Sequence, residues 1–299
     1  MNQYPVAKIS LVTPSFNQGA YIEETFKSVI DQNYPHLEHI VLDAGSTDET
    51  MSVVDRYRAH LSFFRSAPDD GPADAIAAGF DMSTGELFNW LNSDDILLPG
   101  TLLSLGAITS SAPDFDIYAF VGVQSGEHGP YRSAFCKWAD VALPLMLRRI
   151  SFCQESTFLR ASFLKKNGLK VDSNLSHVFD THLYTELLNA GARILFINAF
   201  GGVIRHHASA RTTHGAPQSD LVALNRISPQ HTSRAHEAAL LRILGSRFSW
   251  LWRPLFRTRI VQRIVGKLVG QAPPIYAFCD FIISDSCSCE EPSAWRITR

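Results

Sequence analysis

The chain has 299 residues, of which 45% are hydrophobic and 19% charged, so it can bury one large core with or without an appendage. Its formal net charge of -2 excludes a protein that binds polyanions through overall charge. The five cysteines show no spacing typical of a zinc site, which favours reduced thiols. There is no uncharged apolar run of about 20 residues, and residues 1–10 are too polar for a secretory signal. We therefore expect a cytoplasmic protein.

Strand and helix patterns alternate over the first 110 residues. The expected elements are, in order, a strand at 7–12, a helix at 21–30, a strand at 38–42, a helix start at 46–49, a strand at 61–65, a helix at 72–80 and a strand at 86–91. This alternation predicts an α/β fold in which a parallel sheet carries helices on both faces.

Beyond residue 115 the order becomes mixed. We expect a strand at 117–123, helices at 160–167 and 181–190, and short strands at 193–197 and 202–205. The composition changes at about residue 225, which predicts a first domain over 1–225 and a helical C-terminal region over 226–299.

The C-terminal region contains a basic, amphipathic segment at 234–269. Eight Lys or Arg and one acid lie between Arg234 and Lys267, and the apolar positions within 256–268 share one helical face. This pattern fits a helix lying on an anionic membrane surface, which would make the protein peripheral on the inner face of the membrane. A helix that packs on the first domain, or that binds a partner, fits equally well. No recognition motif accompanies the charge, so we expect no nucleic-acid partner.

Polar clusters follow the expected strands at 13–17, 43–48 and 92–95. In parallel sheets ligands bind beyond the carboxyl ends of the strands, so these clusters should meet at one edge. A carboxylate such as Asp43 can accept a hydrogen bond from a base or a ribose hydroxyl. A strand-to-helix loop and helix caps use the same residue types, and they remain the alternative for the first two clusters.

Two adjacent acids, Asp94 and Asp95, follow an apolar strand. Carboxylates in such a place are costly unless a cation pairs with them. A divalent ion bound together with nucleotide phosphates would supply that cation, because Mg²⁺ and Mn²⁺ prefer oxygen ligands. The alternative is an N-cap for a helix that starts near Pro99.

Six short motifs occur in a fixed order along the chain. They are TPSFNQ (13–18), QNYP (32–35), VLDAGSTDET (41–50), DDGPADAI (69–76), TGE (84–86) and LNSDD (91–95). Taken together, the set resembles family 2 glycosyltransferases of the GT-A fold, most closely the branch that builds bacterial O-antigen and other surface polysaccharides. The resemblance covers about residues 7–215. It implies a Rossmann-like nucleotide-binding sheet with helices on both faces, to which the helical C-terminal extension is added.

The resemblance also assigns roles to individual residues. Nucleotide and donor binding fall to Thr13, Pro14, Phe16, Asp43, Ser46, Asp74, Ser93 and Asp94. QESTFLR (154–160) would line the acceptor side through Gln154, Ser156 and Thr157. VFDTHLYTELL (178–188) would place the catalytic base at Asp180. RHHAS (205–209) would bring His207 to a Mn²⁺ or Mg²⁺ ion held with Asp94 and Asp95.

The implied function is an inverting, metal-dependent transfer of a sugar from a nucleotide sugar, by preference UDP-linked, to an acceptor hydroxyl. The acceptor would be a growing surface glycan or a lipid-linked saccharide. The chain departs from the family pattern at Asp70, Ala77, Glu155 and Phe179. A non-catalytic nucleotide-sugar-binding protein, or a membrane-surface scaffold with a degenerate domain, therefore remains the alternative.

Overall fold

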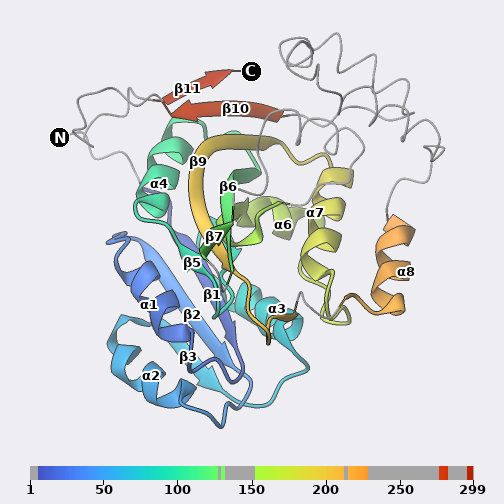
Figure 1. Ribbon diagram of the computed structural model, residues 1–299. Helices are drawn as coiled ribbons and strands as arrows, with labels where there is room; N and C mark the ends of the chain where they lie inside the picture. The colour runs from blue at the N-terminus through green and yellow to red at the C-terminus, as the bar shows by residue number, and fades with distance from the viewer. Residues whose placement is uncertain are drawn as a thin grey trace.

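A computed structural model describes residues 6–126, 129–131, 152–211, 215–227, 276–281 and 295–298. Within these ranges one curved sheet has the strand order β11-β10-β9-β6-β8-β4-β1-β2-β3, with β5 paired to β9 and β7 paired to β6 (Figure 1). The strands are β1 (Ile9–Ser15), β2 (Leu37–Asp43), β3 (Phe63–Ser66), β4 (Leu87–Trp90), β5 (Ile96–Leu97), β6 (Ile117–Gly126), β7 (Gly129–Tyr131), β8 (Thr157–Arg160), β9 (Ile194–Arg205), β10 (Tyr276–Phe281) and β11 (Trp295–Thr298).

The N-terminal half of the sheet is parallel, as the alternating pattern predicts. β1 pairs in parallel with both β2 and β4, and β2 pairs in parallel with β3. Ser15 lies opposite Asp43, and Asp43 lies opposite Ser66, so the carboxyl ends of three strands share one edge. The other half is mixed, because β8 runs antiparallel to both β4 and β6.

Helices cover both faces of the sheet (Figure 1). They are α1 (Ile22–Ile30), α2 (Thr50–Tyr57), α3 (Pro72–Met82), α4 (Thr101–Ser111), α6 (Ala161–Asn167), α7 (Phe179–Asn189) and α8 (Gln218–Ile227), with short 3₁₀ turns at η1 (Arg58–His60) and η2 (Gln154–Ser156). No described helix is long and apolar enough to cross a membrane.

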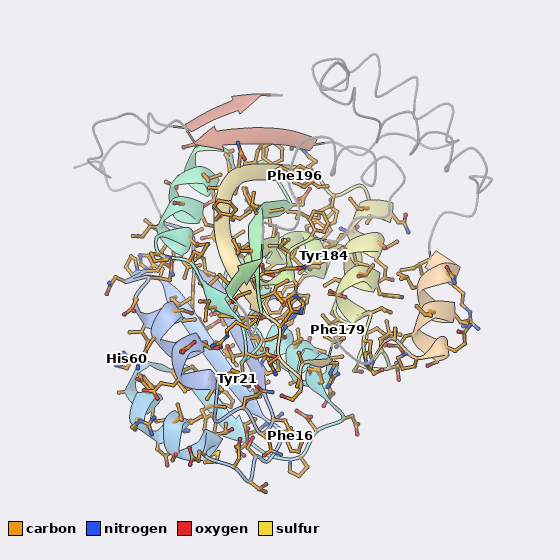
Figure 2. All side chains as sticks on the ribbon, viewed as in Figure 1. Phe16, Tyr21, His60, Phe179, Tyr184 and Phe196 are labelled. Carbon is orange, nitrogen blue, oxygen red and sulfur yellow. The ribbon has the colours of Figure 1, made fainter. Side chains whose placement is uncertain are left out.

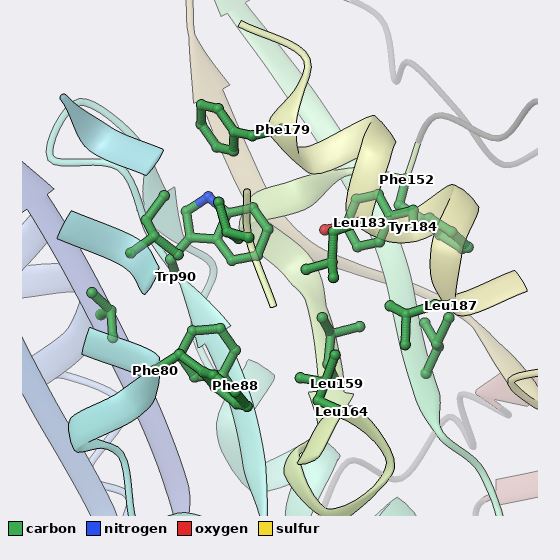
Figure 3. Packing of buried hydrophobic residues seen from close by; sticks show 14 of the residues in the cluster. Phe80, Phe88, Trp90, Phe152, Leu159, Leu164, Phe179, Leu183, Tyr184 and Leu187 are labelled. Carbon is green, nitrogen blue, oxygen red and sulfur yellow. The ribbon is translucent and has the colours of Figure 1, made fainter. Parts of the chain in front are cut away.

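The core has two sides, because neighbouring residues of a strand point to opposite faces. Phe88 and Trp90 of β4 join the cluster formed with α3, α6 and α7 (Figure 3), whereas Leu87 and Leu91 join the cluster beneath α4. Full burial of a Phe-sized side chain stabilises a fold by roughly 1.5–3 kcal/mol. These side chains therefore anchor the strand that ends at the acidic pair.

One expectation about the strands of the second half differs from the structure. The segments expected as strands at 193–197 and 202–205 form one strand, β9, whose pairing with β6 shifts register at Val121. Gly201 permits this irregularity, since a Cβ there would lie 2.6 Å from the Cβ of Phe120. A bulge of this kind interrupts the apolar pattern and resembles a loop in sequence.

The C-terminal region is not helical throughout. β10 pairs in parallel with β9 and β11 pairs antiparallel with β10, so both strands extend the main sheet. This corrects the expectation of a purely helical region over 226–299. The amphipathic segment 234–269 lies outside the described residues.

Candidate active site

The Asp43 carboxylate organises the loop after β2. Its Oδ2 accepts hydrogen bonds from the backbone N–H groups of Gly45 (3.1 Å) and Ser46 (2.9 Å) and from the Ser66 hydroxyl (2.6 Å), and its Oδ1 accepts one from the Ser46 hydroxyl (2.5 Å). Gly45 has φ of +83°, a left-handed conformation that favours glycine. Because Oδ2 is saturated, Oδ1 is the oxygen with room for a further donor.

The Thr13 hydroxyl has an internal role that its motif does not reveal. Its side chain is fully buried, and Oγ1 lies 3.0 Å from Nε2 of His39. Burial lowers the pKa of His39 to about 4, so the imidazole stays neutral. In this conformation the Thr13 hydroxyl contacts His39, and its expected role in nucleoside binding stays a prediction. By contrast, Phe16 has 57% of its surface exposed just beyond β1, with its ring open to a ligand (Figure 2). Pro14, between them, is buried.

The acidic motif and the end of β9 are brought together by β5. Ile96 of β5 pairs with Val203 of β9, which places residues 110 or more apart in sequence side by side. As a result, Oδ2 of Asp94 lies 3.1 Å from Nε2 of His207. The His207 ring stacks on Tyr21 at 4.2 Å between centroids, and its Nδ1 lies 2.8 Å from the Ser209 hydroxyl. The imidazole is therefore held in place from three directions.

Asp95 makes internal hydrogen bonds in this conformation, and its expected role in metal binding stays a prediction. Its side chain is buried, Oδ1 accepts the backbone N–H of Arg205 (3.0 Å), and Oδ2 accepts the Asn92 amide (3.2 Å). Burial, and then the neighbouring Asp94 charge, raise its pKa well above the usual range. Both oxygens are used inside the protein, so Asp95 fastens the motif to β9.

The motif is also tied to α1. The Thr25 hydroxyl lies 2.8 Å from the carbonyl oxygens of both Ser93 and Asp95. The Ser93 side chain is itself buried, which leaves it without access to a donor in this conformation. Asp94 is thus the one acid of the pair whose side chain reaches the surface, with 21% exposed.

The acid-and-imidazole pair fits a divalent ion. A carboxylate suits Mg²⁺ and Mn²⁺, imidazole is a common ligand of transition-metal ions, and such ions often bind few protein groups plus substrate phosphates. Among the described residues no three His, Cys, Asp or Glu side chains gather as a complete metal cage. Asp94 and His207 would suit two positions of such a site, and phosphate oxygens would complete the coordination.

The segment expected to line the acceptor side is buried instead. The Gln154 amide donates to the Trp90 carbonyl oxygen and accepts from Asn92 (3.2 Å), while the Ser156 and Thr157 hydroxyls both donate to the Cys153 carbonyl oxygen. All three side chains are at most 8% exposed. Gln154 thereby contacts the end of β4, and the expectation that the three residues line the acceptor side stays a prediction.

Asp180 lies in the first turn of α7, next to the end of β4. The adjacent Phe179 packs 6.2 Å from Trp90, and Tyr184 stacks on Trp90 one turn later (Figure 3). The Asp180 carboxylate accepts the backbone N–H of Thr181 at 2.6 Å. Desolvation raises its pKa, which strengthens it as a proton acceptor.

Comparison with known proteins bears on this geometry. Residues 10–150 match the sequence profile of Glycosyl transferase family 2. Residues 10–150 are therefore similar to this family. An uncharacterized glycosyltransferase of Rickettsia typhi is 27% identical over 194 residues, which are 62% of this chain and 59% of the relative. A Campylobacter jejuni GalNAc(5)-diNAcBac-PP-undecaprenol β-1,3-glucosyltransferase is 34% identical over 102 residues, 33% of each chain. The chain thus spans about a third to three fifths of these relatives.

Solved structures confirm the GT-A fold. Staphylococcus aureus TarS bound to UDP-GlcNAc superposes with a TM-score of 0.63 at 20% identity, covering 89% of this chain and 82% of that one. A Pyrobaculum calidifontis mannosyltransferase bound to GDP-Man and Mn²⁺ superposes with a TM-score of 0.55 at 17% identity, covering 88% and 87%.

The structure also points to two residues that the sequence analysis does not single out. Asp69 has its pKa raised by desolvation and then by the charges of Asp74 and Asp43, which shows that these carboxylates gather at one edge. Asp69 stands in the motif at 69–76, so its motif was a usable signal. Tyr21, which stacks on His207, had no such signal, because it read as an ordinary apolar helix position.

Proposed function

We propose that this chain transfers a sugar from a nucleotide sugar, by preference a UDP sugar, to an acceptor hydroxyl. The observation that carries the proposal is the contact between Asp94 Oδ2 and His207 Nε2 at 3.1 Å, at the end of a strand whose Trp90 packs against the Asp180 helix. A carboxylate and an imidazole that suit a metal ion, together with a desolvated carboxylate that can accept a proton, are groups that glycosyl transfer can use. The match of residues 10–150 to the family 2 profile and the UDP-sugar complex of TarS support the same class of reaction.

The proposed reaction proceeds with inversion at the anomeric carbon. The acceptor hydroxyl attacks that carbon, and the bond to the diphosphate oxygen breaks with its electron pair on the leaving group. Asp180 takes the hydroxyl proton, for which its raised pKa is suited. Asp94 and His207 would hold Mn²⁺ or Mg²⁺, which supplies positive charge to stabilise the departing diphosphate. Asp95, with its two internal hydrogen bonds, keeps Asp94 in position.

Nucleotide binding gives the direct test. UDP, GDP, CDP and dTDP are each added with and without Mn²⁺, and the melting temperature is measured for the wild type and for Asp94→Ala. Ligand at 100 times Kd stabilises the native state by about 2.7 kcal/mol, an easily measured shift. We expect a shift with UDP that needs Mn²⁺ and is lost in Asp94→Ala.

The matched control is Asp55→Ala, which removes an exposed carboxylate on α2. This variant should keep the full shift. If no nucleotide shifts the wild type, the proposal is wrong. If UDP binds but no sugar is transferred to any acceptor hydroxyl, the chain is a nucleotide-sugar binder instead.

We further propose a surface glycan or lipid-linked saccharide as acceptor. The supporting observation is the Campylobacter jejuni relative, whose name specifies an undecaprenol-linked substrate. Binding of residues 234–269 to an anionic membrane stays a prediction. The test is sedimentation of the protein with vesicles of neutral lipid and with vesicles that contain anionic lipid. The protein should sediment only with the vesicles that contain anionic lipid.

A further inference from the structure

Arg205 and Arg211 lie at the two ends of the loop that follows β9. Arg205 uses most of its N–H donors in hydrogen bonds within the protein. Arg205 donates from Nε to the Asp94 carbonyl oxygen, from Nη2 to the Tyr21 carbonyl oxygen (3.0 Å) and the Thr25 hydroxyl (3.1 Å), and from Nη1 to Glu24 (2.5 Å). These bonds use four of the five N–H donors of a guanidinium. Arg205 therefore fastens β9 to α1 and has little capacity left for a ligand.

Arg211, at the other end of the loop, is in a different situation. Within the described part of the chain its guanidinium makes one hydrogen bond, from Nη1 to the Ser176 carbonyl oxygen at 2.7 Å. The side chain is close enough to Asp94 and Asp69 for both charges to act on it, yet it forms an ion pair with neither among the described residues. The other four N–H donors of Arg211 make no hydrogen bond within the described residues.

The anchor of Arg211 is itself rigidly built. Ser176 belongs to the turn before α7, and the buried Asp220 of α8 accepts hydrogen bonds from the backbone N–H groups of Ser176 (2.9 Å) and His177 (2.8 Å). His207, four residues before Arg211, is fixed on Asp94. Arg211 therefore links the loop after β9, which carries His207, to the turn before α7, the helix that carries Asp180.

The charges at this edge call for a cation besides the metal. The charges of Asp43 and Asp74 both act on Asp69, and the charges of Asp69 and Asp94 both act on Arg211. A diphosphate placed among these carboxylates would be repelled by them unless positive groups faced it. A guanidinium suits this purpose, because its planar fork binds phosphate oxygens in pairs.

We propose that Arg211 binds the diphosphate of the donor, opposite the Asp94–His207 pair, and stabilises it as it departs. This inference rests on the proposed function and names a residue of the same site. When the bond between the anomeric carbon and the diphosphate oxygen breaks, the electron pair stays on the diphosphate. The Arg211 N–H groups, aimed at that oxygen's phosphate, stabilise the charge that develops there.

The test compares Arg211→Gln and Arg211→Lys with Arg226→Gln. Arg226 is exposed on α8 and makes no hydrogen bond with other described residues, so its variant controls for the lost positive charge. Isothermal titration calorimetry with Mn²⁺ present gives Kd for UDP and for uridine. We expect Arg211→Gln to weaken UDP binding by about tenfold or more, as loss of hydrogen bonds to a charged group predicts.

Uridine binding should change less than about twofold in Arg211→Gln, because the nucleoside lacks the phosphates. Arg211→Lys should restore part of the UDP affinity, and Arg226→Gln should equal the wild type. Unchanged UDP affinity in Arg211→Gln, or equal losses for UDP and uridine, overturns the inference and leaves the proposed function intact. Failure of the wild type to bind any nucleoside diphosphate overturns both.

Discussion

Glu155 should make the stability of this protein fall as the pH rises, and Glu155→Gln should abolish that effect. The side chain is fully buried, and neither carboxylate oxygen has a hydrogen-bond partner in the described structure. It fits tightly between two glycines, since a Cβ on Gly122 would lie 2.4 Å from Oε1 and one on Gly202 would lie 2.6 Å from Cγ. Desolvation consequently raises the pKa of Glu155 from 4.5 to about 7.

The sign and size follow from proton linkage. The folded state holds the Glu155 proton up to about pH 7, whereas the unfolded chain releases it near 4.5, so the free energy of unfolding decreases over that window and is constant above it. At 1.36 kcal/mol per pKa unit the whole effect is about 3 kcal/mol. About 2.5 kcal/mol of it falls between pH 5 and pH 8.

Urea denaturation of the wild type and Glu155→Gln at pH 5 and pH 8 measures this. The cost of burying the Gln amide is the same at both pH values, so it cancels when the two differences are subtracted. We expect the wild type to lose about 2.5 kcal/mol more than the variant between pH 5 and pH 8. Parallel curves for the two proteins would refute the reasoning, because they would show that Glu155 does not titrate in this range.

Three further predictions concern the base, the core and the buried imidazole. Asp180→Asn should lower turnover by roughly 10²–10⁴-fold while Kd for UDP is unchanged, as loss of a general base predicts. Product formation measures the turnover and calorimetry measures Kd. Near-normal turnover would remove Asp180 from that role. Gly79→Ala should cost roughly 1–3 kcal/mol in urea denaturation, because the new Cβ would lie 2.6 Å from both Val12 methyl groups; the same loss in a Val12→Ala background would contradict this. His39, with a pKa lowered from 6.5 to about 4 by burial, should cause stability to fall as the pH drops through that window. His39→Gln should flatten that acid limb in pH-dependent melting curves, and an unaltered limb would argue against it.

The alternation of strands and helices over residues 7–110 determined the parallel half of the sheet. Apolar runs of strand length separated by helical periods can bury their surface only in layered α/β form, so local pattern and fold agree there. The same logic placed Asp43 and Asp94 at one edge, because the carboxyl ends of parallel strands lie together. The motif at 178–188 points to Asp180, in the first turn of α7, as the base, which stays a prediction.

The partners of those residues were decided only by the tertiary structure. Thr13 lies in a strand that is buried on both faces, so no alternation of apolar and polar residues indicates which way its hydroxyl points. In the folded chain this hydroxyl contacts His39. Asp94 and Asp95 are adjacent in sequence, yet one meets His207 and the other is used by Arg205 and Asn92, because β5 pairs with β9 across more than a hundred residues. Hydrogen bonds form between atoms that chain folding brings within about 3 Å, and sequence patterns carry no such distances.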